Sequence, residues 1–417
     1  MSLGFMIPRS EAQFLTRPGW ILIFGRRKIG KTFLVRNFLK WDRYYFVTRS
    51  MEVFSFKNSM IEQISYPVFF DRIKREMTEK LTIVIDEFQR LPEDFLDFLH
   101  AVKPIAKAKM MLISSSLYFV EKILGTKSPL LGIVTPFEVG LIKCRDVLST
   151  LLKDFDAKTA LVLATFIRDP FIMESVILTS NLEKFLTDTI TVIKNVVPAL
   201  IGEIFGEEGK KLTARYEAIM KAIAAGNHTP GEVASYISGQ LGEPLKSQDV
   251  KKYMRNLSKM GICKRIKIYQ KKKYFYQIES PLIDLHYYLD VKMGYTEMYI
   301  PLNVLLEEAK KRIPLYYQEF IVNLFAEILN ARIEKRLKDE IDGIYLIDRK
   351  PIAIIEVKMG KISREDVKKI IEKARELNTR PIIFGDNRIS EDNVISITPN
   401  DLPTILRNPN TLKKKLY

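Results

Sequence analysis

A short run near the N-terminus has the residue types and spacing of a phosphate-binding loop. Residues 25–32 read GRRKIGKT and match the pattern G-x-x-x-x-G-K-[ST]. The glycines allow successive backbone N–H groups to curve around a phosphate, Lys31 can reach the β- and γ-phosphate oxygens, and the Thr32 hydroxyl can ligate Mg²⁺. The residues expected to surround a bound nucleotide are Gly25, Arg26, Arg27, Lys28, Ile29, Gly30, Lys31 and Thr32.

Two further groups of polar residues follow apolar runs and complete the expected site. The run LTIVIDE ends in Asp86 and Glu87, where Asp86 is expected to hold the hydration shell of Mg²⁺ and Glu87 to polarise the attacking water. Residues 110–113 precede three serines, and the Ser115 hydroxyl is expected to sense the γ-phosphate. Because a carboxylate pair at a strand end is often merely solvated, this assignment depends on the loop at 25–32.

A third candidate constellation lies near the C-terminus. Asp342 falls in one predicted strand, and Glu356 and Lys358 fall in the next, within IAIIEVKMG. In a β-hairpin the two carboxylates can converge on one divalent cation, while Lys358 shares the face of Glu356 and can activate a water. Glu319 in the preceding helix is a further candidate ligand. A charged, solvent-facing hairpin would give the same pattern without catalysis, although unpaired charges on so apolar a strand are costly.

The apolar pattern predicts the elements that position the first site. A buried-strand run, residues 20–24, precedes the loop, and the helical pattern FLVRNFL follows it, which is the strand–loop–helix order that phosphate binding requires. Together with the runs that end near residues 86 and 113, it predicts a parallel α/β sheet whose carboxyl ends face the nucleotide. Apolar residues at helical spacing over 146–207 predict a helical lid.

The next segment is strongly basic and is patterned as three helices and a hairpin. Residues 211–276 hold 14 Lys or Arg and 4 Asp or Glu, so most of the net charge of +16 lies there. Helices are expected over 214–224, after the capping Thr229, and from Ser247 to Gly261, followed by the strands ICKRIKIYQ and KYFYQIES. This order is the winged helix-turn-helix plan.

On that plan the third helix and the wing approach DNA. The residues expected near phosphates or base edges are Lys251, Lys252, Arg255, Lys271, Lys272 and Lys273. Few side chains on this helix are suited to bidentate base contacts, so low sequence specificity is expected. A winged helix that only packs or dimerises would carry the same charges on a solvated face.

The C-terminal part has a mixed pattern. From Pro314 we expect a helix to Leu337, strands over 340–347 and 352–357, a helix over 364–377 and a strand over 380–385. This αββαβ order is similar to the restriction-endonuclease core.

The chain resembles the archaeal P-loop ATPases of the AAA+/STAND type, through GRRKIGKT, VIDEFQRL and the serine-ended strand before LYFVEKILGTKSPLLG. The resemblance implies ATP and Mg²⁺ as cofactors, a winged helix after the ATPase module and a C-terminal domain similar to PD-(D/E)XK nucleases. It also implies a nucleotide sensor in a Gly-x-Pro turn. This chain departs there, because its nearest counterpart is Arg168-Asp169-Pro170.

These observations define the expected fold class and domains. The class is α/β: a P-loop NTPase parallel sheet with a helical lid, a winged helix-turn-helix and a restriction-endonuclease-like α/β domain. The expected boundaries are 1–145 for the P-loop ATPase core, 146–208 for the helical lid, 209–290 for the winged helix and 291–417 for the PD-(D/E)XK nuclease-like domain.

Composition argues against several classes of protein. No stretch of about 18 uncharged apolar residues occurs, and the N-terminus lacks a signal-peptide pattern, so no membrane partner is expected. Cys144 and Cys263 offer neither zinc-ligand spacing nor a disulfide framework, which favours a cytoplasmic location. With only three histidines in the chain, carboxylate-bound Mg²⁺ or Mn²⁺ is the expected metal.

Three functions stay open on the sequence alone. The first is an ATPase that binds DNA and whose nuclease-like domain cleaves or grips nucleic acid. The second is a slowly hydrolysing regulatory switch whose C-terminal regions dock a protein partner, and the third is a transcriptional regulator that needs a palindromic site. A nucleotide-dependent oligomer also stays open. DNA-stimulated ATP turnover separates the first from the second.

Overall fold

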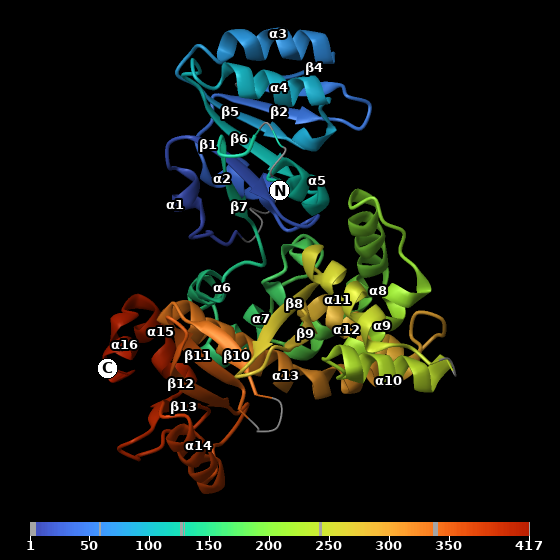
Figure 1. Cartoon of the computed structure of the whole chain (residues 1–417). Helices are drawn as coiled ribbons and strands as arrows, with labels where there is room; N and C mark the ends of the chain where they lie inside the picture. The colour runs from blue at the N-terminus through green and yellow to red at the C-terminus, as the bar shows by residue number, and fades with distance from the viewer. Residues whose placement is uncertain are drawn as a thin grey trace. The chain divides into compact units, whose positions relative to one another are not determined.

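The computed structural model describes residues 6–57, 60–125, 128, 130–241, 244–336 and 341–416. The chain divides into two compact units (Figure 1). The smaller unit comprises Pro8–Leu141 and Ala199–Leu212, and the larger comprises Ile142–Pro198 and the chain from Thr213 onward, with the N-terminal segment up to Ile7. The segment predicted as one lid is therefore shared between the units, and the division falls at Pro198.

The smaller unit is built on a seven-stranded sheet in the order β4-β3-β2-β5-β6-β1-β7. The strands β2, β5, β6, β1 and β7 are parallel, and β3 and β4 add an antiparallel edge. The elements are α1 (Ala12–Leu15), β1 (Trp20–Phe24), α2 (Lys31–Phe38), β2 (Arg43–Val47), β3 (Val53–Lys57), β4 (Met60–Ile64), α3 (Tyr66–Glu76), β5 (Thr82–Asp86), η1 (Phe88–Arg90), α4 (Glu93–Val102), β6 (Lys109–Ser114), α5 (Leu117–Ile123) and β7 (Val134–Glu138). The predicted parallel sheet is confirmed.

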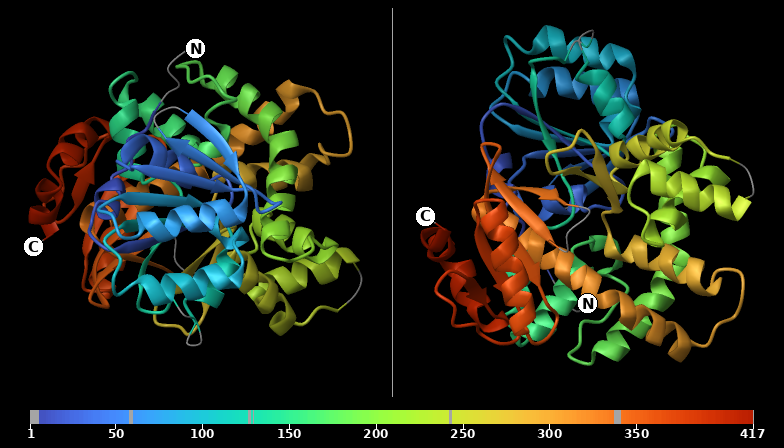
Figure 2. Two further views of the ribbon diagram at one scale, coloured as in Figure 1. Left: turned by 90° about the horizontal axis from the view of Figure 1, so that it is seen from above. Right: turned by 60° about the horizontal axis from the view of Figure 1, so that its bottom comes forward.

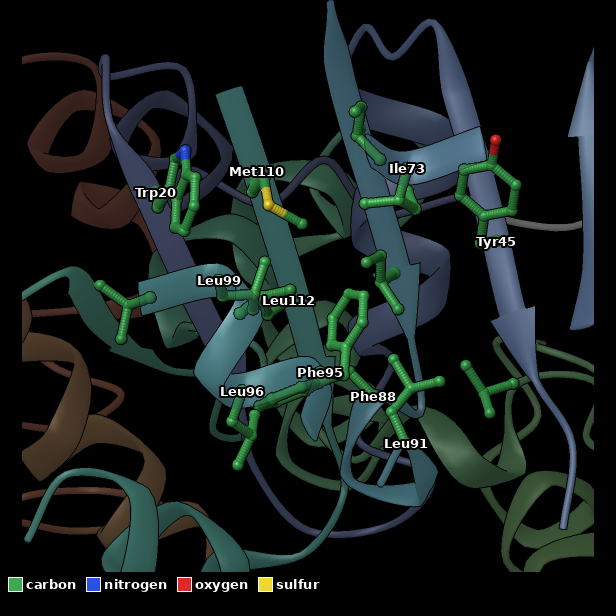
Figure 3. Packing of buried hydrophobic residues seen from close by; sticks show 14 of the residues in the cluster. Trp20, Tyr45, Ile73, Phe88, Leu91, Phe95, Leu96, Leu99, Met110 and Leu112 are labelled. Atoms are coloured by element: carbon green, nitrogen blue, oxygen red, sulfur yellow. The ribbon is translucent and has the colours of Figure 1, made fainter. Parts of the chain in front are cut away.

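Both faces of the central strands are apolar because helices cover both. One face packs against α3, α4 and α5, and Figure 3 shows Phe88, Phe95 and Leu99 meeting Met110 and Leu112 of β6. The other face packs against α1 and α2. This double burial explains the continuous apolar runs of β1, β5 and β6, and it leaves the ends of these strands as the positions where polar residues gather.

The larger unit contains a second seven-stranded sheet, in the order β14-β13-β12-β11-β10-β8-β9. Its elements are α6 (Cys144–Leu151), α7 (Ala157–Ile167), η2 (Pro170–Ile172), α8 (Leu182–Glu207), α9 (Ala214–Ala224), α10 (Pro230–Leu241), α11 (Ser247–Lys259), β8 (Cys263–Ile268), β9 (Tyr274–Ile278), α12 (Pro281–Met293), α13 (Leu302–Leu329), β10 (Arg332–Lys335), β11 (Gly343–Ile347), β12 (Lys350–Val357), α14 (Arg364–Glu376), β13 (Arg380–Phe384), β14 (Ile395–Ile397), η3 (Pro399–Asp401), α15 (Leu402–Arg407) and α16 (Asn410–Leu416). The last residues of α8 belong to the smaller unit. Figures 1 and 2 show α14 along the C-terminal strands, against β12 and β13.

The predicted three helices and hairpin are present as α9, α10, α11, β8 and β9. Thr229 and Glu232 cap the start of α10 reciprocally, and Gly261 follows α11 with a φ of 68°. The hairpin, however, does not stand alone. Because β8 pairs in parallel with β10 through Glu334 and Lys335, the hairpin extends the C-terminal sheet.

Two of the predicted C-terminal elements have the wrong limits. The helix expected from Pro314 to Leu337 is α13, which starts at Leu302 and ends at Leu329, and β10 follows it. Pro314 is tolerated inside α13 because apolar residues on both sides of it, Ile313 and Tyr316 among them, are buried. Asn330, with a φ of 54°, ends the helix. The predicted strand over 340–347 begins at Gly343, and residue 340 lies outside the described residues.

The helix α8 is long and apolar enough to span a membrane, with a mean hydropathy of 1.4 in its most apolar window. Its buried residues nevertheless recur at helical spacing on one face, as in Phe185, Ile190, Ile193, Val197 and Ile204. One such helix is weak support for a membrane span, and a stripe of this kind is typical of a helix packed in a protein core.

Candidate nucleotide-binding site and C-terminal acidic pair

The backbone of the loop after β1 curves as a phosphate-binding loop does. Gly25, Lys28 and Gly30 have φ values of 153°, 56° and 89°, so the chain turns tightly before α2 begins at Lys31. A Cβ at position 25 would lie 2.2 Å from the carbonyl oxygen of Val139 on the segment after β7. Glycine is therefore required at position 25, for its conformation and for the close approach of the neighbouring backbone.

Lys31 is buried and held by the loop itself. Its Nζ donates to the carbonyl oxygens of Gly25 at 2.8 Å and Arg26 at 2.9 Å. Burial lowers the pKa of Lys31 to about 8, while the carboxylates of Glu87 and Asp86 oppose that shift. An anionic phosphate would supply the compensating charge that this buried ammonium group partly lacks.

Asp86 and Thr32 meet at the end of β5. Thr32 Oγ1 donates to Asp86 Oδ2 at 2.7 Å, the Tyr44 hydroxyl donates to the same oxygen at 2.5 Å, and the Glu87 backbone N–H donates to Oδ1 at 2.9 Å. Burial raises the pKa of Asp86, and the hydrogen bonds from Tyr44 and Thr32 oppose it. A hydroxyl beside a carboxylate is the oxygen-donor set that Mg²⁺ accepts, so these residues fit the metal that the loop implies.

Glu87 and Ser115 are brought together as the sheet order requires. The strand β6, which leads to Ser115, lies between β5 and β1, and Ser115 Oγ donates to Glu87 Oε2 at 3.1 Å. Glu87 is buried with a φ of 58°, and its carboxylate also accepts from Gln89 Nε2 at 2.8 Å. Arg90 lies 3.0 Å from the same carboxylate. The expected base and the expected sensor are thus direct partners.

The remaining residues of the loop have different environments. Ile29 is buried in the apolar cluster of β1 and α2, Lys28 is exposed, and Arg26 is buried with its Nη1 donating to the Arg27 carbonyl oxygen at 3.1 Å. Arg27 extends to the end of α8, where Glu203 and Glu207 accept from its guanidinium at 2.9 and 2.7 Å.

Several of these partners were absent from the sequence prediction. No sequence motif includes Tyr44, Glu203 or Glu207. The two glutamates are more than 170 residues from Arg27 in the chain. Arg168, the candidate replacement for the usual sensor, lies in the larger unit, where its Nε donates to the Ile142 carbonyl oxygen at 2.9 Å.

The strand register of the larger unit places Asp342 and Glu356 on the same face. Gly343 pairs with Ile355 in the β11–β12 ladder, so Asp342 and Glu356, one position further, are direct neighbours across the strands. Burial raises the pKa of Glu356 to about 7, and the negative charge of Asp342 adds to that shift. Lys358 Nζ lies 3.0 Å from Glu356 and 3.3 Å from Asp366. The three residues predicted from the D…ExK pattern are therefore close together.

The helix α13 contributes a different residue from the one expected. Gln318 Nε2 donates to Asp342 Oδ1, and the Val357 backbone N–H donates to Oδ2 at 2.7 Å. Glu319 instead faces Lys335 at 3.9 Å. Among the described residues no group of three His, Cys, Asp or Glu side chains could hold a metal. A cation at Asp342 and Glu356 would need water or substrate oxygens to complete its shell.

The basic residues predicted to contact DNA are all at the surface. Lys251, Lys252 and Arg255 are exposed on α11, and Lys271, Lys272 and Lys273 are exposed at the β8–β9 turn. Arg265 of β8, which the sequence analysis did not single out, lies over the Tyr274 ring at 4.1 Å.

Comparison with known proteins agrees with the geometry of the smaller unit. Residues 17–147 match the family model described as AAA domain. This match, with the loop and the Thr32–Asp86 contact, identifies the smaller unit as an AAA-type P-loop domain. Over 398 residues the chain is 28% identical to Uncharacterized protein MJECL04 of Methanocaldococcus jannaschii, covering 84% of this chain and 85% of that protein.

Comparison with solved structures gives matches of low similarity. The Walker-type ATPase PABY2304 of Pyrococcus abyssi is 16% identical, with a TM-score of 0.46, over 68% of this chain and 96% of that chain. The Aeropyrum pernix ORC1 protein in complex with DNA is 14% identical, with a TM-score of 0.31, over 69% of this chain and 91% of that chain. Scores this low support no inference beyond the AAA match.

Proposed function

We propose that this protein is a Mg²⁺-dependent ATPase that binds DNA through α11 and the β8–β9 turn. The observation that carries the ATPase proposal is the pair of direct contacts, Thr32 with Asp86 and Ser115 with Glu87, whose carboxylates both act on the buried Lys31. These contacts join the loop, the acidic strand end and the serine strand into one site.

The residues of the smaller unit have distinct roles in this proposal. The backbone N–H groups of the loop and Lys31 would bind the β- and γ-phosphates. Thr32 and Asp86 would hold Mg²⁺, whose positive charge would stabilise the negative charge on the phosphate oxygens. Glu87 orients the attacking water and accepts its proton. Ser115 keeps the Glu87 carboxylate directed toward the phosphate and responds to the γ-phosphate.

The DNA-binding proposal rests on the local charge and exposure of α11 and the β8–β9 turn. Each phosphate contact releases condensed counterions, so the logarithm of affinity should fall with the logarithm of salt by roughly 0.9 per contact. Changing Lys271, Lys272 and Lys273 together to Ala should weaken duplex binding and reduce that slope. The matched control changes Lys413, Lys414 and Lys415 to Ala, which removes the same charge from the last turn of α16. Equal losses in both triple variants would contradict a specific role for the turn.

We also propose that Asp342 and Glu356 share a divalent cation and that Lys358 assists cleavage of nucleic acid. The strand register makes the two carboxylates neighbours, which supports a shared cation. The ion pair between Lys358 and Glu356 places the lysine beside the same carboxylates. Digestion of linear, branched and single-stranded DNA with Mg²⁺ or Mn²⁺ tests the activity. Cleavage that survives Lys358→Ala would show that this lysine is not catalytic.

One assay tests the main proposal as a whole. ATP hydrolysis by the full chain is measured with and without duplex DNA, for the wild type and for Glu87→Gln. We expect DNA to stimulate hydrolysis by the wild type only. If DNA does not change the rate of ATP hydrolysis, the ATPase activity does not depend on the DNA-binding surface. A cytoplasmic location, which we propose as well, suits Cys144 and Cys263, since both are buried free thiols.

A further inference from the structure

The end of α8 and the residue that follows it contact two parts of the candidate nucleotide site. Glu203 and Glu207 accept from Arg27 of the phosphate-binding loop at 2.9 and 2.7 Å. Glu208 accepts from the first two backbone N–H groups of α5, at 2.6 and 2.8 Å, directly after the three serines. All of these residues lie in the smaller unit, so the contacts are internal to it.

Two glutamates of α8, together with Glu87, which also pairs with Arg90 at 3.0 Å, surround Arg27. Its guanidinium faces the carboxylates of Glu203 and Glu207 and, at 3.7 Å, that of Glu87. The negative charge of Glu207 also acts on Lys31, where it opposes the effect of burial on the pKa. A triphosphate that entered the loop would therefore meet repulsion from the same carboxylates that hold Arg27.

The ion pairs of Arg27 are of a kind that a phosphate can displace. The Arg27 side chain is 26% exposed, and its partners Glu203 and Glu207 are 39% and 15% exposed. One carboxylate oxygen of Glu207 is buried and has no hydrogen-bond partner among the described residues. Partly exposed ion pairs are weak, whereas a guanidinium binds phosphate oxygens in a strong, charge-assisted geometry.

We propose that Glu203 and Glu207 form a latch that competes with the nucleotide for Arg27. In this arrangement, named here the α8 latch, nucleotide binding draws Arg27 to the phosphates and releases the end of α8. The proposal rests on the proposed ATPase function, since it needs a nucleotide in the loop. A purely structural role of Glu203 and Glu207 predicts weaker nucleotide binding when they are changed. The α8 latch predicts stronger nucleotide binding.

Release of the latch would act on the segment that joins the two units. Residues of α8 up to Pro198 belong to the larger unit and those from Ala199 onward to the smaller. Pro198 has no backbone N–H and so cannot donate to the helix at that point. Nucleotide binding should therefore loosen Ala199–Leu212, and this change would reach the larger unit through the chain itself.

The test compares equilibrium ATP binding by the full chain across four proteins. In Glu203→Gln/Glu207→Gln, roughly tenfold tighter binding than in the wild type is expected if two weak ion pairs no longer compete for Arg27. The matched control, Glu62→Gln/Glu93→Gln, removes two charges from exposed ion pairs of the same unit and should bind as the wild type does. The fourth protein, Lys31→Ala, should lose binding.

The outcomes distinguish the latch from the ATPase proposal. Wild-type binding that depends on Lys31, with unchanged or weaker affinity in the Glu203/Glu207 variant, overturns the latch alone. No binding by any of the four proteins overturns both proposals. Hydrogen exchange is a second measurement: ATP should speed amide exchange over Ala199–Leu212 in the wild type but not in Lys31→Ala, and slower exchange with ATP would contradict release.

Discussion

In the smaller unit the carboxylates of Asp86 and Glu87 each accept a hydrogen bond from a hydroxyl, whereas in the larger unit the contacts of Asp342 and Glu356 with described residues include a side-chain amide, a backbone N–H and a lysine. In the proposed ATPase, the first arrangement would supply one hydroxyl to Mg²⁺ and another to the carboxylate that orients the water. The second leaves two neighbouring carboxylates whose repulsion contributes to raising the pKa of Glu356 to about 7. The difference shows that the hydrogen bonds of the first site hold its carboxylates in place, while the second site keeps an electrostatic repulsion that the proposed cation would relieve.

The largest effect should come from Glu87→Gln, which keeps the shape of the side chain but removes the base. Turnover of ATP should fall by about 10²- to 10⁴-fold, while ATP binding persists. Steady-state hydrolysis and equilibrium binding measured on the same preparation check this. The control is Glu93→Gln, an exposed carboxylate of the same unit. Normal turnover in Glu87→Gln would place the base elsewhere and remove the contrast between the two sites.

Lys31→Ala should reduce ATP affinity by about 100-fold or more, because a buried charge-assisted contact to the phosphates is lost. Lys40→Ala is the matched control, since Lys40 is an exposed lysine of the same unit that lies outside the loop. Isothermal titration of ATP into both variants gives the comparison. Similar affinities for the two would mean that the loop does not bind phosphate through its buried lysine.

Tyr44→Phe should weaken Mg²⁺-dependent ATP binding by roughly tenfold, because residues that orient a metal ligand typically influence metal affinity by that amount. The adjacent Tyr45→Phe is the control, since the Tyr45 hydroxyl donates to Glu76 and not to Asp86. Titration of Mg²⁺ at fixed ATP separates the metal effect from nucleotide binding. If both variants respond alike, Tyr44 serves packing only.

The smallest effect concerns the acidic pair of the larger unit. Mn²⁺ or Mg²⁺ should raise the melting temperature of the full chain by roughly 2–6 °C, because the cation binds the acidic pair in the folded state. Asp342→Asn should remove this increase. Asp348→Asn, in the exposed turn before β12, is the control. The full chain is required because β8 pairs with β10. An identical shift in Asp342→Asn would leave the pair as a structural feature.

Local sequence was sufficient to predict the helices and strands whose periodicity and capping residues lie within one short stretch of the chain. The strand before the loop, the helix after it and the helices α9, α11 and α14 were predicted at nearly their observed positions, because apolar periodicity and capping residues act over a few residues. The limits of α13 were not predictable in this way. Proline at 314 signals a boundary, yet burial on both sides of it overrides that signal.

What the sequence by itself determined is which residues come together in the candidate nucleotide site: the loop, Lys31, Thr32, Asp86, Glu87 and Ser115 were all predicted from motif and strand-end position. Parallel strands place their carboxyl ends at one edge of a sheet, so residues far apart in the chain converge there by topology alone. Only the tertiary structure decided that Tyr44 holds Asp86, that Gln318 rather than Glu319 contacts Asp342, and that Glu203 and Glu207 hold Arg27. Those contacts depend on how separate elements pack, and side-chain packing between distant segments leaves no spacing pattern in the sequence.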